Sequence, residues 1–228
     1  MIISIIIIIL FIIIISIILY TYKNNEINNK YVELVNTPSD INEHLQILSK
    51  YASKCDSVLE LGVRGCISSW AFANGLINNN NGNKKELFLN DIKPCDISEL
   101  YNSVNDINLS INYEWCNDLD LDLKNKKYDL VFIDTWHVYG QLKRELNKFS
   151  KIANKYIIMH DTTIDGIYGE TIRNNWNAKE QSIETNIPED EILKGLMPAI
   201  NEFLLNNTDW IIKEKYENNN GLTILQKI

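Results

Sequence analysis

The sequence predicts an α/β fold, in which a mostly parallel sheet is covered by helices and preceded by one apolar N-terminal helix. Short apolar runs that lack charges recur along its 228 residues, as expected for strands buried on both faces. Segments with the apolar spacing of helices separate these runs, and this alternation favours parallel strands joined by helical crossovers. The last two apolar runs are separated by Glu217-Asn-Asn-Asn-Gly221, which predicts an antiparallel hairpin.

The N-terminal segment is almost wholly apolar. Its first 20 residues contain only two polar side chains, Ser4 and Ser16. As a helix, the uncharged run from Ile2 to Leu19 would span about 27 Å, close to the hydrocarbon thickness of a membrane. The run lacks a basic start and a small-residue cleavage site, which argues against the alternative of a cleaved signal peptide. A buried helix is the third alternative.

The residues after this run set the expected domain boundaries and topology. Lys23 and Lys30 are the first basic residues, and the positive-inside rule then places the rest of the chain in the cytoplasm. We therefore expect a single-pass transmembrane anchor at 1–22, a polar tether at 23–39 and one catalytic-sized domain at 40–228.

The elements of that domain follow from their local patterns. Helix-like spacing occurs at 41–48, 70–77 and 138–150. Apolar runs predict five strands and then the two strands of the hairpin, at 57–61, 87–90, 111–115, 128–134, 155–160, 210–216 and 222–226.

Composition excludes several classes of function. The net charge of −8 argues against nucleic-acid binding, which needs a basic face. The four cysteines form no CxxC pair and the three histidines have no zinc-finger spacing, so neither a zinc finger nor a disulfide scaffold is expected. Free cysteines favour a reducing compartment.

Sheets of this kind bind ligands at the carboxyl ends of their strands. After the first strand, Glu60 precedes a turn with Gly62 and Gly65, whose backbone can approach a ligand closely. A plain strand-to-helix turn is the alternative, and the spacing is not the dinucleotide-binding G-x-G-x-x-G. Asp91 follows the second strand, where a carboxylate can accept both hydroxyls of a ribose, although an exposed turn aspartate would look the same.

The last three parallel strands end in polar residues. After the third, Asp118 would lie near an adenine edge, although a structural role is favoured for it. Asp134 and His137 follow the fourth strand, and Asp161 follows the fifth. Charges at the end of buried strands are costly unless something is bound, so these three residues are candidates for function. His160 is either part of the same site or a structural prop.

Five stretches together resemble a known family. They are VLELGVRGCISSW, FLNDIKP, YDLVFIDTWHVYGQLKRELNKF, YIIMHDTT and GLMPAINEFL. They are similar to class I S-adenosylmethionine (SAM)-dependent methyltransferases, in particular to the branch with cephalosporin-hydroxylase-like proteins and macrolide-sugar and rhamnosyl O-methyltransferases. The resemblance covers the chain from about residue 40 to its end.

This resemblance implies a Rossmann-like, seven-stranded sheet and a set of roles. Asp134 and Asp161 match positions that bind a divalent cation, usually Mg²⁺, and His137 matches a catalytic base. The sequence departs from the pattern at Cys66, where relatives often have glycine, and at His160, where some have an acidic residue. The cofactor set would comprise Glu60, Gly62 and Gly65 in the loop, Asp91 at the ribose and Asp118 near the adenine.

The expected activity is SAM-dependent methylation of a hydroxyl of a sugar or glycan. Such a hydroxyl is weakly acidic, so it needs a base such as His137 or a cation held by Asp134 and Asp161. Alternatives are methylation of a phenolic or other small diol, a catalytically silent membrane-tethered module, and a nicotinamide oxidoreductase. The polar segment 164–193 is expected to form a substrate lid, and self-association stays open.

Overall fold

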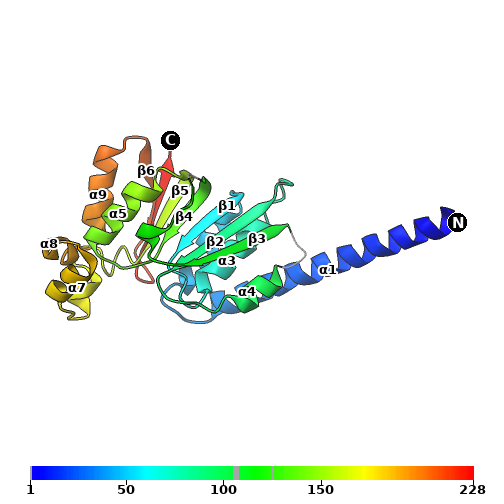
Figure 1. The fold of residues 1–228 in the computed structure, drawn as a ribbon, viewed down its shortest axis with the longest axis horizontal. Helices are drawn as coiled ribbons and strands as arrows, with labels where there is room; N and C mark the ends of the chain where they lie inside the picture. Colours follow the sequence, from blue (N-terminus) through cyan, green and yellow to red (C-terminus); the bar gives the residue numbers. More distant parts are fainter. Residues whose placement is uncertain (1, 105–107, 125) are drawn as a thin grey trace.

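The computed structural model describes residues 2–104, 108–124 and 126–228; within the first helix, the described side chains are those of 5–15 and 26–36. One seven-stranded sheet forms the centre, in the order β3-β2-β1-β4-β5-β7-β6 (Figure 1). Strands β1 to β5 run parallel, and β7 is antiparallel to both β5 and β6. The strands are Ser57–Leu61 (β1), Lys85–Asp91 (β2), Leu109–Trp115 (β3), Tyr128–Ile133 (β4), Ala153–His160 (β5), Trp210–Tyr216 (β6) and Leu222–Lys227 (β7).

The predicted sheet and its C-terminal hairpin are therefore confirmed, with small differences at strand ends. β2 begins at Lys85 and β3 at Leu109, each two residues earlier than predicted. The added residues include polar ones in both strands: Glu86 of β2 lies opposite Ser110 of β3 in the ladder. Because β3 is the edge strand of the sheet, polar side chains are tolerated there, and the apolar run alone underestimates strand length.

Helices cover both faces of the sheet. The helices α2 and α3 pack on one face, together with the second half of α1, and α5 and α9 pack on the other (Figure 1). Successive residues of β4 serve the two layers, since Phe132 packs against Phe72 of α3 while Val131 belongs to the other core. The helices of the domain are Leu45–Ala52 (α2), Ile67–Ile77 (α3), Ser98–Ser103 (α4), Tyr139–Phe149 (α5), Glu170–Arg173 (α6), Ala178–Thr185 (α7), Glu189–Ile192 (α8) and Leu196–Asn206 (α9), with 3-10 turns at Asn42–His44 (η1) and Asp118–Asp120 (η2).

The first helix, α1, runs from Ile2 to Asn36 and so includes most of the segment predicted to be a polar tether. Ile27 is fully buried, and Tyr31 and Val35 pack against the same core. These three residues are spaced four apart, which places them on one face of a helix. This apolar stripe docks the second half of α1 onto α3 and explains why the segment is helical rather than extended.

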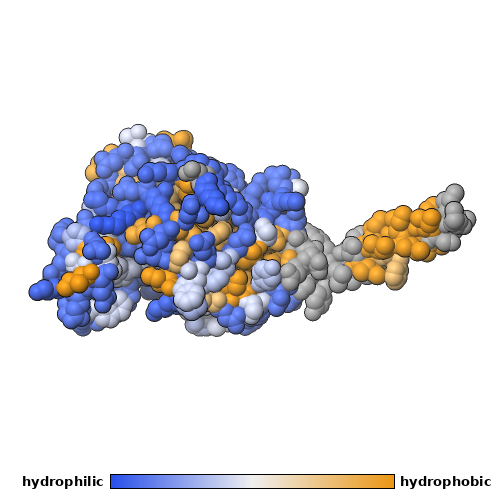
Figure 2. All heavy atoms as spheres, in the orientation of Figure 1, coloured by the Kyte–Doolittle hydropathy of each residue, from blue (hydrophilic) through white to orange (hydrophobic). Residues whose placement is uncertain are grey.

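The amino-terminal half of α1 projects away from the domain (Figure 1). The side chains of 5–15 are all exposed, from 40% at Ile15 to 64% at Phe11, and they form the apolar surface seen in Figure 2. Among the side chains that the structure describes, no helix has an apolar stretch long enough to cross a membrane. The anchor predicted at 1–22 also includes 1–4 and 16–22, whose side chains lie outside that description.

Candidate active site

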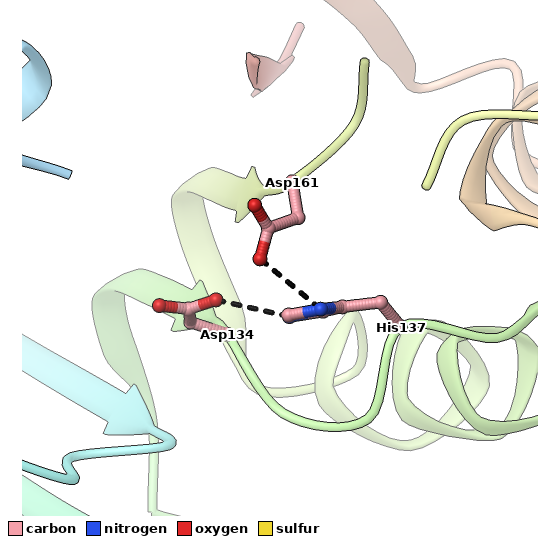
Figure 3. Close-up of side chains that lie close together, drawn as sticks. All are labelled: Asp134, His137 and Asp161. Atoms are coloured by element: carbon pink, nitrogen blue, oxygen red, sulfur yellow. Dashed lines mark hydrogen bonds and ion pairs between the residues drawn. The ribbon is translucent and has the colours of Figure 1, made fainter. Parts of the chain in front are cut away.

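Three of the predicted residues meet at the carboxyl ends of β4 and β5. Asp134 directly follows β4, Asp161 directly follows β5, and His137 lies in the loop between β4 and α5. Because β4 and β5 are neighbours in the sheet, their ends bring the two carboxylates together. The ligand atoms of all three side chains lie within 4.8 Å of one another (Figure 3).

The His137 ring is enclosed by carboxylates. Nε2 lies 3.1 Å from Asp134 Oδ1, with hydrogen-bond geometry, and Nδ1 lies 3.1 Å from Asp161 Oδ2 and 3.3 Å from Asp165 Oδ2. Burial opposes a charge on the ring, but the surrounding carboxylates outweigh it and hold the pKa of His137 well above its usual value. In turn, the histidines outweigh burial at Asp134 and lower the pKa of that carboxyl.

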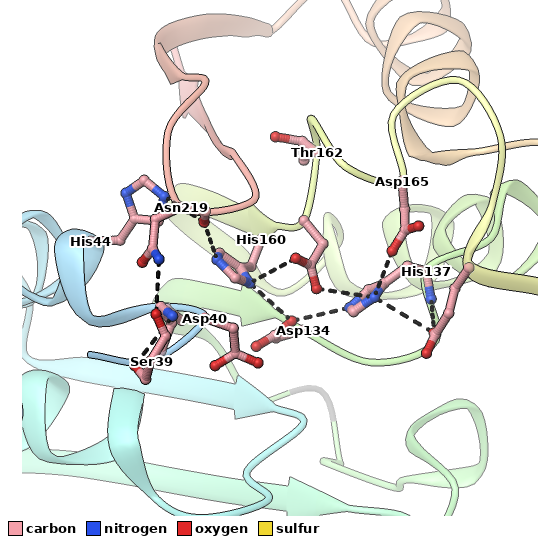
Figure 4. A network of polar contacts seen from close by, with 12 residues as sticks. Ser39, Asp40, His44, Asp134, His137, His160, Thr162, Asp165 and Asn219 are labelled. Atoms are coloured by element: carbon pink, nitrogen blue, oxygen red, sulfur yellow. Dashed lines mark hydrogen bonds and ion pairs between the residues drawn. The ribbon is translucent and has the colours of Figure 1, made fainter. Parts of the chain in front are cut away.

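His160 is the fourth side chain of the cluster. It is the last residue of β5 and only 2% exposed, and Nε2 lies 3.1 Å from the carbonyl oxygen of Asn219 in the β6–β7 loop (Figure 4). Nδ1 lies 3.5 Å from both Asp134 Oδ1 and Asp161 Oδ1. Burial lowers the pKa of His160, but the two carboxylates outweigh it and raise the pKa to about 10.

Three further residues of the site were not assigned to it from the sequence: Asp165, Arg173 and Glu170. Asp165 is fully buried, and Arg173 of α6 binds it with two nitrogen–oxygen contacts of 2.7 and 2.8 Å. Glu170 fixes the backbone around His137, because its amide donates to the His137 carbonyl at 3.0 Å and its carboxylate accepts from the His137 amide at 3.4 Å. The signals in the sequence were an aspartate four residues after Asp161 and an arginine eight residues after that aspartate.

The contacts of Asp165, Glu170 and Arg173 around His137 show that segment 164–193 forms part of the site. The segment was predicted to be an irregular lid, but it contains α6, α7 and α8 and is bonded into the domain. The amide of Gly195 donates to the carbonyl of Ile167, and the amide of Leu196 donates to that of Asp165, both at 2.9 Å. Two aromatic residues of this segment, Tyr168 and Trp176, are 66% and 48% exposed.

The glycine turn after β1 packs directly against the cluster. Gly62 has φ +88°, and a Cβ atom there would lie 1.9 Å from the carbonyl oxygen of Asp134. At Gly65 a Cβ atom would meet nothing within 4 Å, so the surface above it is open. Asp91 stabilises this turn, because its Oδ2 accepts the amides of Val63 and Arg64, both at 2.9 Å. Burial opposes this, but these amide bonds lower the pKa of Asp91.

The remaining predicted residues, Glu60 and Asp118, are buried. Glu60 is fully buried beneath the turn and accepts from the Ser68 hydroxyl, and burial raises its pKa to about 8. Asp118 Oδ1 accepts from Gln141 at 3.0 Å, and burial raises the pKa of this carboxyl too. Whether either residue contacts a cofactor stays a prediction.

A cavity of about 180 Å³ adjoins the open side of the turn. Gly65, Cys66 and Trp70 contribute one wall, and Lys30 and Leu34 of α1 contribute another. The docked half of α1 therefore closes the domain next to the predicted cofactor loop.

The fold matches solved O-methyltransferases over most of its length. An O-methyltransferase from Bacillus cereus in complex with SAH is 14% identical with a TM-score of 0.52, and the match covers 91% of each chain. TomG from Streptomyces achromogenes, an O-methyltransferase involved in tomaymycin synthesis and solved with SAM, is 13% identical with a TM-score of 0.54, covering 90% of this chain and 89% of that one. The SAH-bound methyltransferase PaMTH1 from Podospora anserina is 14% identical with a TM-score of 0.50, covering 89% and 88%.

This chain has the fold of the class I O-methyltransferases. The class-level prediction is thus confirmed for the fold. No protein-family model and no curated protein matches the sequence. The narrower resemblance to the cephalosporin-hydroxylase-like and sugar-methylating branch stays a prediction, as do the roles of the individual residues.

Proposed function

We propose that this methyltransferase-fold protein is a SAM-dependent enzyme that methylates a hydroxyl of a sugar or glycan with the help of a divalent cation. The observation that carries this proposal is the cluster of Asp134, His137 and Asp161 at the carboxyl end of the sheet, with ligand atoms within 4.8 Å of one another. These residues lie at the rim of the sheet, by which we mean the carboxyl ends of β4 and β5. A base and two carboxylates there can remove the proton of an unreactive hydroxyl and bind a cation that lowers its pKa, so that the oxygen can attack a methyl group.

The glycine turn suits the cofactor. Gly65 leaves open space above the backbone, and Gly62 allows the turn to lie directly against Asp134. Asp91 Oδ1 accepts the Lys93 amide at 2.8 Å, and a carboxylate oxygen can accept more than one hydrogen bond, which suits Asp91 to a ribose hydroxyl. When bound, SAM supplies an activated methyl group on a sulfonium. We propose that Glu60 and Asp118, which are both buried, belong to the cofactor site.

Asp134 and Asp161 suit a divalent cation, and Mg²⁺ is the ion that the family resemblance implies. Asp161 Oδ1 is buried and accepts no hydrogen bond, so the site contains a carboxylate oxygen that lacks a partner. When bound, the cation lowers the pKa of the hydroxyl that contacts it. The two carboxylates, with a vicinal diol of the acceptor, hold the reacting oxygen in place.

His137 then manages the proton. With Nε2–H donating to Asp134, Nδ1 is the ring nitrogen that would take the proton of the acceptor hydroxyl. Asp161 Oδ2 and Asp165 Oδ2 lie 3.1 and 3.3 Å from Nδ1, and together with Asp134 these carboxylates hold the pKa of His137 high. A cation bound by Asp134 and Asp161 would offset their charge, lower the pKa of His137 and so favour its role as a base.

A direct test combines binding with turnover. Calorimetry with SAM, with and without Mg²⁺, measures cofactor binding, and mass spectrometry detects added methyl groups on a panel of glycosides and catechols. Methylated glycosides that are lost with Asp134→Asn are the expected result. Methylated catechols alone would move the acceptor to phenolic diols. SAM binding without product on any acceptor would indicate a silent module, and no SAM binding would refute the proposal.

We also propose that the projecting end of α1 binds a membrane, with the domain on the cytoplasmic side. The exposed apolar side chains of 5–15 support this. Co-flotation with lipid vesicles is the measurement. Ile8→Asp with Phe11→Asp is expected to abolish flotation, whereas Ile183→Asp, at a 73% exposed position of α7, is expected to leave it unchanged. Equal flotation of all variants would refute membrane binding through α1.

A further inference from the structure

Two histidines face the carboxylates of the rim, and they are held differently. His137 has its Nε2 in hydrogen-bond geometry with Asp134 Oδ1, and its side chain is 14% exposed. Its Nδ1 faces Asp161 Oδ2 at 3.1 Å and Asp165 Oδ2 at 3.3 Å, which suits the proton transfer proposed for it above. His160 is only 2% exposed, so it cannot contact an acceptor from outside.

The orientation of His160 is fixed by a backbone carbonyl. Nε2 lies 3.1 Å from the carbonyl oxygen of Asn219, and a carbonyl oxygen can only accept a hydrogen bond. Nε2 therefore carries the hydrogen, and Nδ1 is directed at the carboxylates. Metal-binding histidines characteristically donate their second ring nitrogen to a carbonyl or a carboxylate in this way.

Nδ1 of His160 stands at equal distances from the two carboxylates, 3.5 Å from Asp134 Oδ1 and 3.5 Å from Asp161 Oδ1. Neighbouring ligand atoms held at about 2.1 Å from one ion are roughly 3 Å apart, so only small side-chain movements separate this arrangement from a ligand set. Asp161 Oδ1 also lacks a hydrogen bond, although the Asp161 side chain is only 9% exposed. A buried, unpartnered carboxylate oxygen beside a directed imidazole nitrogen points to a cation.

We propose that His160 Nδ1 is the third protein ligand of the cation held by Asp134 and Asp161, and that this donor set favours a first-row transition dication over Mg²⁺. The inference deepens the proposed function and rests on its cation site. Mg²⁺ prefers an all-oxygen octahedral shell, whereas imidazole nitrogen suits transition metals. His137 stays outside this set and remains the base.

The β6–β7 loop holds this ligand in place. The side chain of Asn219 accepts the Glu43 amide at 3.1 Å and donates to the Ser39 carbonyl at 2.9 Å. His44 Nε2 lies 3.2 Å from the same Asn219 carbonyl oxygen that binds His160. The carbonyl that orients the ligand is thus anchored to the segment that follows α1 (Figure 4).

The test measures metal binding without any need for turnover. The full-length protein is titrated with Mn²⁺ and with Mg²⁺ by calorimetry, and the Mn²⁺-loaded protein is examined by electron spin-echo spectroscopy for coupling to imidazole nitrogen. The expected result is at least tenfold tighter binding of Mn²⁺ than of Mg²⁺, together with nitrogen coupling. His160→Asn presents an amide oxygen near the position of Nδ1 and removes the imidazole. It is expected to lose the nitrogen coupling and most of the preference for Mn²⁺.

His44→Asn and His137→Asn are the matched controls, and both are expected to retain the coupling. Loss of coupling in His137→Asn, with retention in His160→Asn, would make His137 the ligand and overturn the proposal. Absence of nitrogen coupling in the unaltered Mn²⁺-loaded protein would overturn it whether or not His160→Asn folds. None of these measurements needs methyl transfer. The metal-binding result can therefore be interpreted even if the proposed methyltransferase activity is not found.

Discussion

The two ends of the same parallel strands carry polar clusters of opposite character. At the amino end, Asp56 precedes β1 and accepts from the side chains of Asn81, Asn83 and Lys85, each at 2.7 Å. Both of its carboxylate oxygens are used, and these bonds, Lys85 first, outweigh burial and lower its pKa to about 2. At the carboxyl end, Asp161 Oδ1 and His137 Nδ1 are buried without a hydrogen bond.

This difference separates a structural cluster from a functional one. Partners of opposite charge and amide donors satisfy Asp56, so that cluster needs nothing else. The cluster after β4 and β5 gathers acidic groups and histidines but leaves Asp161 Oδ1 and His137 Nδ1 without a hydrogen bond, a costly arrangement that the proposed cation or acceptor would relieve. Hydrogen-bond satisfaction therefore identifies the site better than the number of charges does.

The largest expected effect is a difference between the two clusters in the rate of methyl transfer. Asp134→Asn is expected to lower the rate of methyl transfer by about a thousandfold, because it removes both a cation ligand and the partner of His137. Asp56→Asn is expected to keep the rate within about twofold, since it lies at the other end of the strands. Rates with saturating SAM measure both; similar losses in the two variants would refute the distinction.

Alanine substitutions at two glycines with positive φ, one at each end of the strands, compare how closely the two ends are packed. Gly62→Ala is expected to cost about 4 kcal/mol, because the new Cβ would lie 1.9 Å from the Asp134 carbonyl oxygen. Gly82, at φ +79°, has nothing within 4 Å of its Cβ position, so Gly82→Ala should cost only about 1 kcal/mol of backbone strain. Urea denaturation measures both, and equal costs would contradict the close packing at the rim.

Arg173 tests whether the rim's buried charge depends on its partner. Arg173→Ala leaves Asp165 buried and without its bidentate cation, and the free energy of unfolding should fall by about 3 kcal/mol. Arg64→Ala breaks an exposed pair with Asp40 and should cost less than about 1 kcal/mol. A fall of less than 1 kcal/mol for Arg173→Ala would mean that water replaces the arginine.

Glu60 and Asp56 are expected to change the free energy of unfolding with pH in opposite directions. The folded pKa of Glu60, about 8, lies above the ordinary value of 4.5, so its contribution to stability is complete below pH 4.5 and is lost as the pH rises towards 8. Relative to Glu60→Gln, the unaltered protein should lose about 3 kcal/mol between pH 5 and pH 8. Thermal unfolding at several pH values measures this, and parallel curves would refute it. Asp56, with a lowered pKa, loses its contribution only in acid.

The sequence predicted the parts of the site that stand directly after strands. Asp134 and Asp161 follow uninterrupted apolar runs, and parallel pairing of β4 with β5 then places them together. Asp165 and Arg173 were missed because their contact depends on how segment 164–193 folds back on His137. No periodicity encodes such a tertiary contact.

Asparagine-rich stretches hid two structural roles. In the run at 78–81, Asn79 and Asn81 both bind Asp56. In the run at 218–220, Asn219 orients His160. Low sequence complexity conceals such roles, because the side chains are interchangeable on paper and specific only once the loop has its backbone conformation.

The contact between Asn219 and Glu43 joins residues that are 176 positions apart. The carbonyl that orients His160 therefore takes its final position only after the β6–β7 loop has been synthesised. During synthesis, α1 and the segment that follows it emerge long before this loop. The geometry around His160 thus depends on a late meeting of two segments that are made at different times.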